Sequence, residues 1–433
     1  MNLLLVCPSV HKDNTKRIKP FWLPPLNLAI IAGLTPSNWD ITLVDENVED
    51  VDFTKHYDLV GISSMTANSR RAYEIADTFR RNKIPVVFGG SHASVCSEEV
   101  GEHADCVVIG EAEPVWNNLL NDLANNSLKK IYKADLKVST NTFGKPRREL
   151  YNKENYLSIN TIQTSKGCPY KCSFCSIASR FEGKYGMKPL ADVISEVEEL
   201  ADKSMPIFFV DDNFLVNRTR SKKLLTELKR LKITWWSQAD ITIMNDPDML
   251  DLMRESGCIK VVVGFESISV GSIEAINKNQ NKIEDYVNFV KTLRNHGILV
   301  NSSFAFGTDY DNENVFIDTF NFLKDNEIIF ATFNILTPLP GTQLFLQLKN
   351  ENRLTDLNWD NYDMGHTVFQ TKNINEQKVK EGYDWICHEF YSFQEISKRV
   401  STLRNSPFEY DQRLIMGWNL GYKRLLDTFG VFM

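Results

Sequence analysis

The chain has no long apolar run, no excess of positive charge and no dense set of cysteines. No stretch approaches the roughly 18 apolar residues that a membrane helix requires, so we expect no membrane span. The formal net charge of −7 argues against nucleic-acid binding, which depends on clustered Lys and Arg. Eight cysteines in 433 residues do not make a disulfide framework, and residues 1–8 lack the layout of a signal peptide. These absences predict a cytoplasmic protein in a reducing compartment.

What is present is the composition of a globular enzyme. Hydrophobic residues make up 42% of the chain and charged residues 24%. A chain of 433 residues is long enough for two or three domains with a large core.

The first part of the chain alternates short aliphatic runs with helical segments. The runs are residues 2–7, 41–44, 59–63, 85–88 and 106–109. Strands at this spacing predict a Rossmann-like, doubly wound parallel sheet over residues 1–125. Ligands of such sheets bind at the carboxyl ends of the strands. A polar segment, 126–157, is expected to be a linker.

A second series of strands, each followed by a helical segment, occupies residues 158–345. The strands are expected at residues 158–164, 207–210, 234–237, 260–264, 299–306 and 332–336. Six such units predict a partial (β/α)6 barrel of the TIM type, whose chemistry belongs at the C-terminal strand ends. Residues 346–433 are expected to form a mostly helical cap, with helical spacing over 376–403 and 414–432.

Three cysteines, Cys168, Cys172 and Cys175, stand in a C-x3-C-x2-C run directly after the first strand of this series. Thiolates are the ligands that iron–sulfur clusters prefer, and a four-iron cluster ordinarily takes four of them. The loop offers three, and no fourth Cys or His lies nearby in sequence, so one iron would remain open for chemistry. A structural zinc site is the alternative, but it would require a fourth ligand close by.

The cysteine spacing closely resembles the signature of the radical S-adenosylmethionine superfamily. In that family the open iron of a [4Fe-4S] cluster binds the amino and carboxylate groups of S-adenosylmethionine, and an electron from the cluster generates a 5′-deoxyadenosyl radical. The resemblance places Phe174 beside the adenine and implies an electron donor such as flavodoxin or ferredoxin. It also implies S-adenosylmethionine contacts at the strand ends, from Asp211, Asp212, Asn213, Gln238, Glu266, Gly307 and Leu336. Any one of these taken alone could be a helix cap or a turn residue.

The strand ends of the first domain resemble those of cobalamin-binding domains fused in front of radical S-adenosylmethionine enzymes. The resemblance implies cobalamin contacts from Pro8, Ser63, Met65, Thr66, Gly89, Gly90, His92, Gly110 and Glu111. The D-x-H-x-x-G motif that supplies a cobalt-ligating histidine is incomplete here, with only His11 at the corresponding place. We expect a cobalamin with its lower base displaced and no protein ligand below the metal. A sheet of this type that has kept no ligand is the alternative.

Residues 359–369, after the barrel, resemble a stretch of cobalamin-dependent members that act on lipids and other hydrophobic substrates. Tyr362 and His366 are therefore candidate catalytic residues that close over the substrate. The alternative is a structural turn with a hydrogen-bonded histidine. The aromatic residues of the following helical segments fit either a core or a substrate-facing cap.

Both resemblances together imply a cobalamin-dependent radical S-adenosylmethionine methyltransferase that acts on carbon, or less favourably on phosphorus. The expected partner is a small-molecule or lipid-like substrate. Two alternatives stay open: an enzyme with the same cofactors that cyclises, couples or rearranges its substrate without methyl transfer, and a cobalamin or cluster sensor without turnover.

Overall fold

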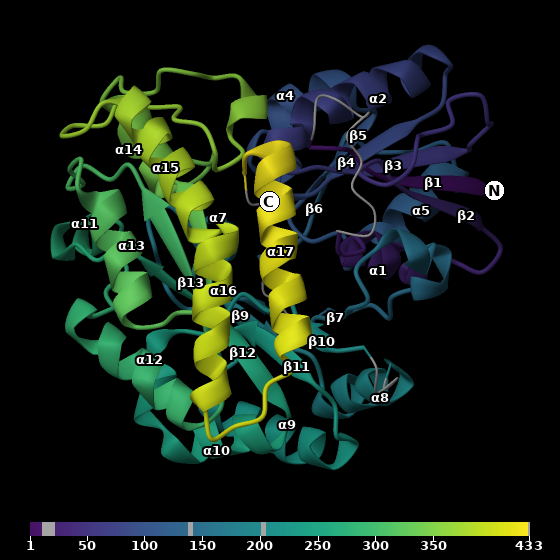
Figure 1. The fold of residues 1–433 in the computed structure, drawn as a ribbon. Coiled ribbons are helices and arrows are strands. Elements are labelled where there is room, and N and C mark those ends of the chain that lie inside the picture. The colour runs from purple at the N-terminus through teal and green to yellow at the C-terminus, as the bar shows by residue number, and fades with distance from the viewer. Residues whose placement is uncertain (11–21, 137–141, 201–204, 432–433) are drawn as a thin grey trace.

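The computed structural model describes residues 1–10, 22–136, 142–200 and 205–431, and Figure 1 shows two α/β units side by side with helices in front. The first unit is a six-stranded sheet in the order β2-β1-β3-β4-β5-β6, with every neighbouring pair parallel. Its strands are β1 (Asn2–Cys7), β2 (Asp40–Asp45), β3 (Leu59–Ser63), β4 (Val86–Gly89), β5 (Cys106–Ile109) and β6 (Ile131–Lys133).

Helices cover both faces of this sheet, as the doubly wound prediction requires. The helices are α1 (Leu26–Leu34), α2 (Ser69–Arg81), α3 (Ser91–Val95), α4 (Ser97–His103) and α5 (Trp116–Ala124), and a 3-10 turn, η1 (Thr66–Asn68), precedes α2. One apolar core joins α2, α3 and α4 to the sheet, and a second joins α1 and α5 to its other face. The prediction of a doubly wound parallel sheet is confirmed.

The first sheet extends beyond the boundary expected at residue 125. Strand β6 lies in the segment expected to be a linker and pairs with β5. It is a three-residue edge strand in which Tyr132 is buried while Ile131 and Lys133 are exposed. Too few residues alternate there for a sequence pattern to indicate a strand.

The second unit is an open, parallel six-stranded sheet in the order β14-β13-β12-β11-β10-β7, which confirms the partial barrel. Its strands are β7 (Asn160–Ile162), β10 (Ile207–Phe209), β11 (Trp235–Gln238), β12 (Cys258–Glu266), β13 (Leu299–Phe306) and β14 (Phe330–Ile335). The helices that follow them are α8 (Leu190–Leu200), α9 (Arg218–Leu231), α10 (Pro247–Glu255), α11 (Val270–Ala275), α12 (Tyr286–Asn295), α13 (Val315–Asp325) and α14 (Gln343–Asn350). A small antiparallel hairpin, β8 (Ser165–Gly167) with β9 (Tyr185–Met187), encloses the cysteine loop and α7 (Ser176–Phe181).

The C-terminal region is helical, as expected, and its described residues after 375 contain the helices α15 (Glu376–Phe390), α16 (Phe393–Thr402) and α17 (Gln412–Phe429). The helical pattern over 376–403 divides into two helices because Ser392 caps α16 by accepting a hydrogen bond from the Glu395 amide. Among the described residues, no helix combines the length and the apolar character needed to cross a membrane.

Helix α17 lies against the barrel sheet through an aromatic cage around a buried lysine. Trp235 of β11 bonds Ser256 at the end of α10, so its neighbour Trp236 faces the opposite side of the sheet. There the Lys260 ammonium lies 5.0 Å from the Trp236 ring centre, 4.9 Å from Phe330 and 4.1 Å from Trp418 of α17. Lys260 is only 5% exposed, and burial lowers its pKa to about 7, although the rings favour the charged form.

This buried lysine makes the stability of the protein depend on pH. Between pH 7 and about 10 the unfolded chain holds a proton on Lys260 that the folded chain has lost, so the free energy of unfolding rises with pH. Replacing Lys260 by Met removes this rise, and we expect the difference in stability between variant and wild type to change by roughly 1–4 kcal/mol over that range. Urea denaturation at several pH values measures it. The exposed Lys282→Met variant is the control, and equal pH profiles for Lys260→Met and wild type would contradict the prediction.

Candidate functional site

The cysteine loop is held in place by a buried carboxylate at the end of β10. Asp211 is fully buried and accepts hydrogen bonds from the Thr164 amide at 3.1 Å, from the Thr164 hydroxyl at 3.0 Å and from the Ser165 hydroxyl. Burial raises the pKa of Asp211 to about 6, against the lowering effect of these donors. Asp211 was expected to bind S-adenosylmethionine, but its oxygens are already used to fix the start of the loop.

Cys168, Cys172 and Cys175 are free, partly exposed thiols of one loop. Burial, with a smaller contribution from the neighbouring thiols, raises the pKa of Cys168 to about 12, and burial also raises the pKa of Cys175. The other cysteines of the described chain lie on other elements, at Cys7, Cys96, Cys106, Cys258 and Cys387. Three clustered thiols are a donor set that fits an iron–sulfur cluster with one open iron.

Two polar residues next to this loop, Lys278 and Gln280, belong to no sequence motif. Burial lowers the pKa of Lys278, but Glu266 and the thiols of Cys172 and Cys175 outweigh it and hold that pKa above its usual value. Gln280 donates an amide N–H to the Cys172 sulfur at 3.7 Å. Both follow α11, far from the cysteines in sequence, so only the fold could reveal them.

Glu266 stands at the end of β12 as expected, in an unusual backbone conformation. Its φ is +62°, the strand register shifts between Gly264 and Glu266, and its carboxylate forms an ion pair with Lys278. Non-glycine residues rarely adopt positive φ, and such strained positions cluster at functional sites. This placement supports Glu266 as a ligand-binding residue.

The other barrel residues singled out by sequence lie at the same strand ends but in different surroundings. Burial raises the pKa of Asp212 to about 7, with a further contribution from Asp211. Asn213 donates to Asp240 at 2.8 Å, while its side-chain oxygen is buried and has no partner within the described chain. The Gly307 amide already bonds Asp311 at 2.8 Å.

The remaining three expected contacts of S-adenosylmethionine are less polar or less enclosed. Leu336 is buried, and Phe174 packs against the same apolar cluster. Gln238 ends β11 with a half-buried side chain.

A cavity of about 600 Å³ lies between the two sheets and receives side chains from both. Of the nine residues expected to contact cobalamin, six line it: Ser63, Met65, Gly89, Gly90, Gly110 and Glu111. Asp212 and Arg180 line it from the barrel side. Pro8, Thr66 and His92 are not among the lining residues, so the strand-end pattern located the edge of the sheet but not every side chain that faces the cavity.

Gly89 and Gly90, at the end of β4, are needed for different reasons. A Cβ built on Gly89 would meet no heavy atom of the described residues within 4 Å, so the space beside it belongs to the cavity. Gly90 has φ +98°, and a Cβ there would lie 2.4 Å from the Ser64 carbonyl oxygen. Gly90 is therefore needed by the protein's own backbone, whereas Gly89 leaves room that fits a large planar cofactor.

A buried ionic cluster joins the two domains at the edge of this cavity. Lys166 of β8, only 1% exposed, pairs with Glu113 and lies 3.2 Å from Glu111, both in the turn after β5. Arg180 of α7 binds Glu111 at 2.6 Å. Glu111 was expected to contact cobalamin, and the structure shows it holding the cysteine-loop region against the first domain.

Tyr362 and His366 have local partners. Tyr362 is buried, its hydroxyl donates to the Asp356 carbonyl at 2.8 Å, and burial raises its pKa to about 12. His366 is half exposed and pairs with Asp363 at 2.9 Å. Neither lines the cavity, so these contacts favour the structural-turn interpretation. His11 lies outside the described residues.

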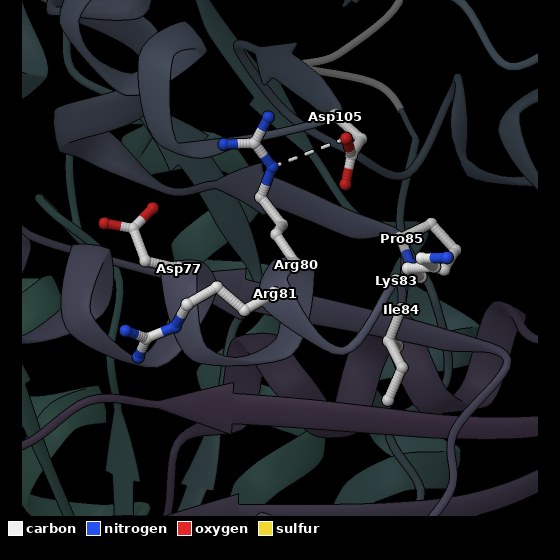
Figure 2. A pocket seen from close by; sticks show the side chains of 7 residues that line it. All are labelled: Asp77, Arg80, Arg81, Lys83, Ile84, Pro85 and Asp105. Carbon is white, nitrogen blue, oxygen red and sulfur yellow. Dashed lines mark hydrogen bonds and ion pairs between the residues drawn. The ribbon is translucent and has the colours of Figure 1, made fainter.

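A second hollow, of about 670 Å³, lies at the amino end of β4 (Figure 2). Its cations are Arg80, Arg81 and Lys83, and Arg80 already binds Asp105 at 3.4 Å and the Glu102 carbonyl at 2.8 Å. The hollow is at the opposite end of the strands from the cysteine loop and takes no part in that site.

Comparison with known proteins identifies the two domains. The Radical SAM superfamily profile matches residues 162–323, and the B12 binding domain profile matches residues 20–120. The chain is 31% identical to bacteriochlorophyllide d C-12(1)-methyltransferase of Chlorobaculum tepidum, over 87% of this chain and 84% of that protein. It belongs to the cobalamin-dependent radical S-adenosylmethionine methyltransferases.

A second relative in this methyltransferase family is bacteriochlorophyllide d C-8(2)-methyltransferase of Chlorobaculum tepidum, 32% identical over 90% of this chain and 89% of that protein. The cobalamin-dependent S-adenosylmethionine radical enzyme OxsB has the same fold, with a TM-score of 0.66 and 13% identity over 98% of this chain and 71% of that chain. The family's cofactors are a [4Fe-4S] cluster, S-adenosylmethionine and cobalamin, and this confirms the cofactors predicted from the sequence.

The cysteine loop provides a direct test of cluster ligation. Anaerobic reconstitution of the wild type should give about four irons per chain, and replacing Cys168, Cys172 or Cys175 by Ala should abolish the cluster absorbance because each thiolate binds one iron. Iron analysis and visible absorbance measure the effect. The buried Cys258→Ala variant is the control, and an equal loss of iron there would mean that a fourth cysteine closes the cluster.

Proposed function

We propose that this methyltransferase adds a methyl group to an unactivated carbon of a tetrapyrrole-type substrate. The observation that carries the proposal is the cavity that the cobalamin-domain strand ends share with the cysteine-loop side of the barrel. The names of the two Chlorobaculum relatives support the substrate class. Apolar residues line the cavity from both domains. Those of the cobalamin domain support cofactor binding there and include Leu5, Leu28, Ile31, Ile62, Val87, Val108 and Trp116, while Ile177, Phe181 and Val210 line it from the barrel side.

The proposal assigns a task to each group of residues. Cys168, Cys172 and Cys175 would hold the cluster, and Asp212 and Glu266 would hold S-adenosylmethionine at the barrel rim. The glycine-rich strand ends, at Gly89 and Gly110, would admit cobalamin. When bound, these groups supply a hydrogen-abstracting radical and a transferable methyl group, which side chains cannot supply.

The chain itself orients the reactants and excludes water. Its polar groups at the cavity are already bonded to one another across the domains, through Lys166, Glu111 and Arg180. Such fixed groups need little rearrangement when a reactant binds. The reducing electron would come from a small redox protein such as flavodoxin or ferredoxin, and the protein would work in the cytoplasm.

Asp211 and Asp212 form an adjacent pair whose proposed roles can be separated. Asp212→Asn should keep the cluster and weaken S-adenosylmethionine binding roughly ten- to a hundredfold, because a charge-assisted hydrogen bond is lost. Asp211→Asn should instead lower iron content, because its amide would place a donor against the Thr164 and Ser165 donors. Equilibrium binding and iron analysis distinguish them. Wild-type affinity in Asp212→Asn would remove Asp212 from the site.

The product assay tests the function itself. Reduced protein is incubated with S-adenosylmethionine bearing a deuterated methyl group and with a bacteriochlorophyllide, and mass spectrometry follows 5′-deoxyadenosine and labelled product. The proposal expects one labelled methyl on a carbon of the macrocycle. Labelled methyl on a polycyclic isoprenoid offered in parallel would overturn the substrate class. Product without label would indicate cyclisation or rearrangement in place of methyl transfer.

A further inference from the structure

The Trp359 segment after the barrel docks on the cobalamin domain. Trp359, in the 3-10 turn η6 (Trp359–Asn361), donates its indole N–H to Glu99 of α4 at 2.9 Å. Arg70 of α2 donates to Asn358 at 2.9 Å and lies 3.7 Å from Asp360. The segment that resembles a substrate-closing stretch is therefore an interdomain contact.

A chain of hydrogen bonds continues from this contact into the first domain. The Tyr73 hydroxyl lies 2.9 Å from Glu99 and 2.9 Å from His92 Nε2, and His92 Nδ1 lies 3.3 Å from the Thr66 hydroxyl. The Glu99 carboxylate only accepts, so Tyr73 donates to it and accepts from His92 Nε2–H. Burial lowers the pKa of His92 to about 4, so the ring is neutral, and its Nδ1 accepts from Thr66.

The hydrogen-bond network explains this group of side chains better than a metal site does. His92, Cys96 and Glu99 each offer one ligand atom, all within 4.8 Å of one another. The Tyr73 hydroxyl, however, binds both His92 and Glu99 and so takes up the ligand atoms that a metal would need. Trp359, Glu99, Tyr73 and His92 thus already have hydrogen-bond partners in one another and, at His92 Nδ1, in Thr66.

The chain of bonds ends at the turn that forms part of the cavity wall. Met65 lines the cavity and is 56% exposed. Its amide bonds the Asn68 side chain at 2.8 Å, and Asn68 in turn donates to the Pro8 carbonyl at 2.9 Å. The His92 amide donates to the Ser64 carbonyl at 3.2 Å. Pro8 and His92 thus anchor the 64–68 turn from behind, and His92 does so partly through Thr66 of the turn itself.

We propose that Tyr73, His92, Glu99 and Trp359 are positioning residues that hold the 64–68 turn against cobalamin. Because Trp359 belongs to the segment after the barrel, the order of this turn depends on the docking of that segment. The proposal rests on the cobalamin-binding role of the cavity and does not depend on the methyl acceptor. It gives the Trp359 segment a function at the cofactor without contact to substrate.

Two variants break the chain of hydrogen bonds while keeping an aromatic ring at each position. Trp359→Phe removes the indole N–H, and Tyr73→Phe removes the hydroxyl between Glu99 and His92. In the cobalamin-free full chain, each should speed amide hydrogen exchange of residues 64–68 and weaken binding of hydroxocobalamin roughly three- to tenfold, because each variant loses a hydrogen bond to the Glu99 carboxylate that helps to hold the turn. Absorbance titration and mass-spectrometric exchange are the readouts.

Trp235→Phe is the matched control. Its indole N–H is fully buried and donates to the Ser256 carbonyl at 3.0 Å, but it lies in the barrel core. It should lower the melting temperature and leave both cobalamin affinity and the exchange of residues 64–68 unchanged. Loss of stability alone is thereby separated from loss of positioning.

The double variant Tyr73→Phe/Trp359→Phe tests whether the bonds act as one chain. Since either change breaks the chain, the double should bind cobalamin about as weakly as the weaker single variant. If Trp359→Phe leaves exchange and affinity at wild-type values, or if the two effects multiply, the proposal is wrong. Failure to methylate a tetrapyrrole would overturn the proposed substrate and leave these measurements unaffected.

Discussion

The ion pairs of Lys166 with Glu111 and Glu113 are the constraint on which the arrangement of this protein depends. A lysine with 1% exposure is costly unless acceptors surround it, and removing one partner of such a buried pair typically costs about 3–5 kcal/mol. Lys166 lies two residues before Cys168, whereas both glutamates follow a strand of the other sheet. The bridge therefore fixes the cysteine loop relative to the cobalamin domain, and the cavity exists because two sheets present their carboxyl ends to each other.

Sequence patterns were most informative where local physics determines the structure. Strands β1, β3 and β5 occupy the residues expected, because each is a continuous aliphatic run of a sheet buried on both faces. The cysteine loop was equally legible, since its ligand spacing is contained within eight residues. Strand β6 was not legible, because an edge strand with one buried residue leaves no periodic pattern.

Side-chain direction was the part that sequence could not supply. Thr66 and His92 stand at strand ends beside cavity residues, yet they turn toward Tyr73 and each other. Tyr362 is an aromatic residue in a motif-like stretch, yet its hydroxyl donates a hydrogen bond to the nearby Asp356 carbonyl. Lys278 and Lys166 act through partners 12 to 55 residues away, and such long-range pairing is set by the fold. The candidate site was thus predictable in its location and cofactors, but not in the network that supports it.

The shared cavity has a thermodynamic consequence. Its wall is complete only while the two domains are docked, so occupancy and docking are linked equilibria, and each strengthens the other by the same factor. Cobalamin then stabilises the docked domains as well as taking part in the reaction. This stabilisation grows with the logarithm of the cobalamin concentration divided by its dissociation constant. Without cobalamin the two domains would separate more often. The cobalamin concentration in the cell would then influence the fraction of the protein whose domains are docked.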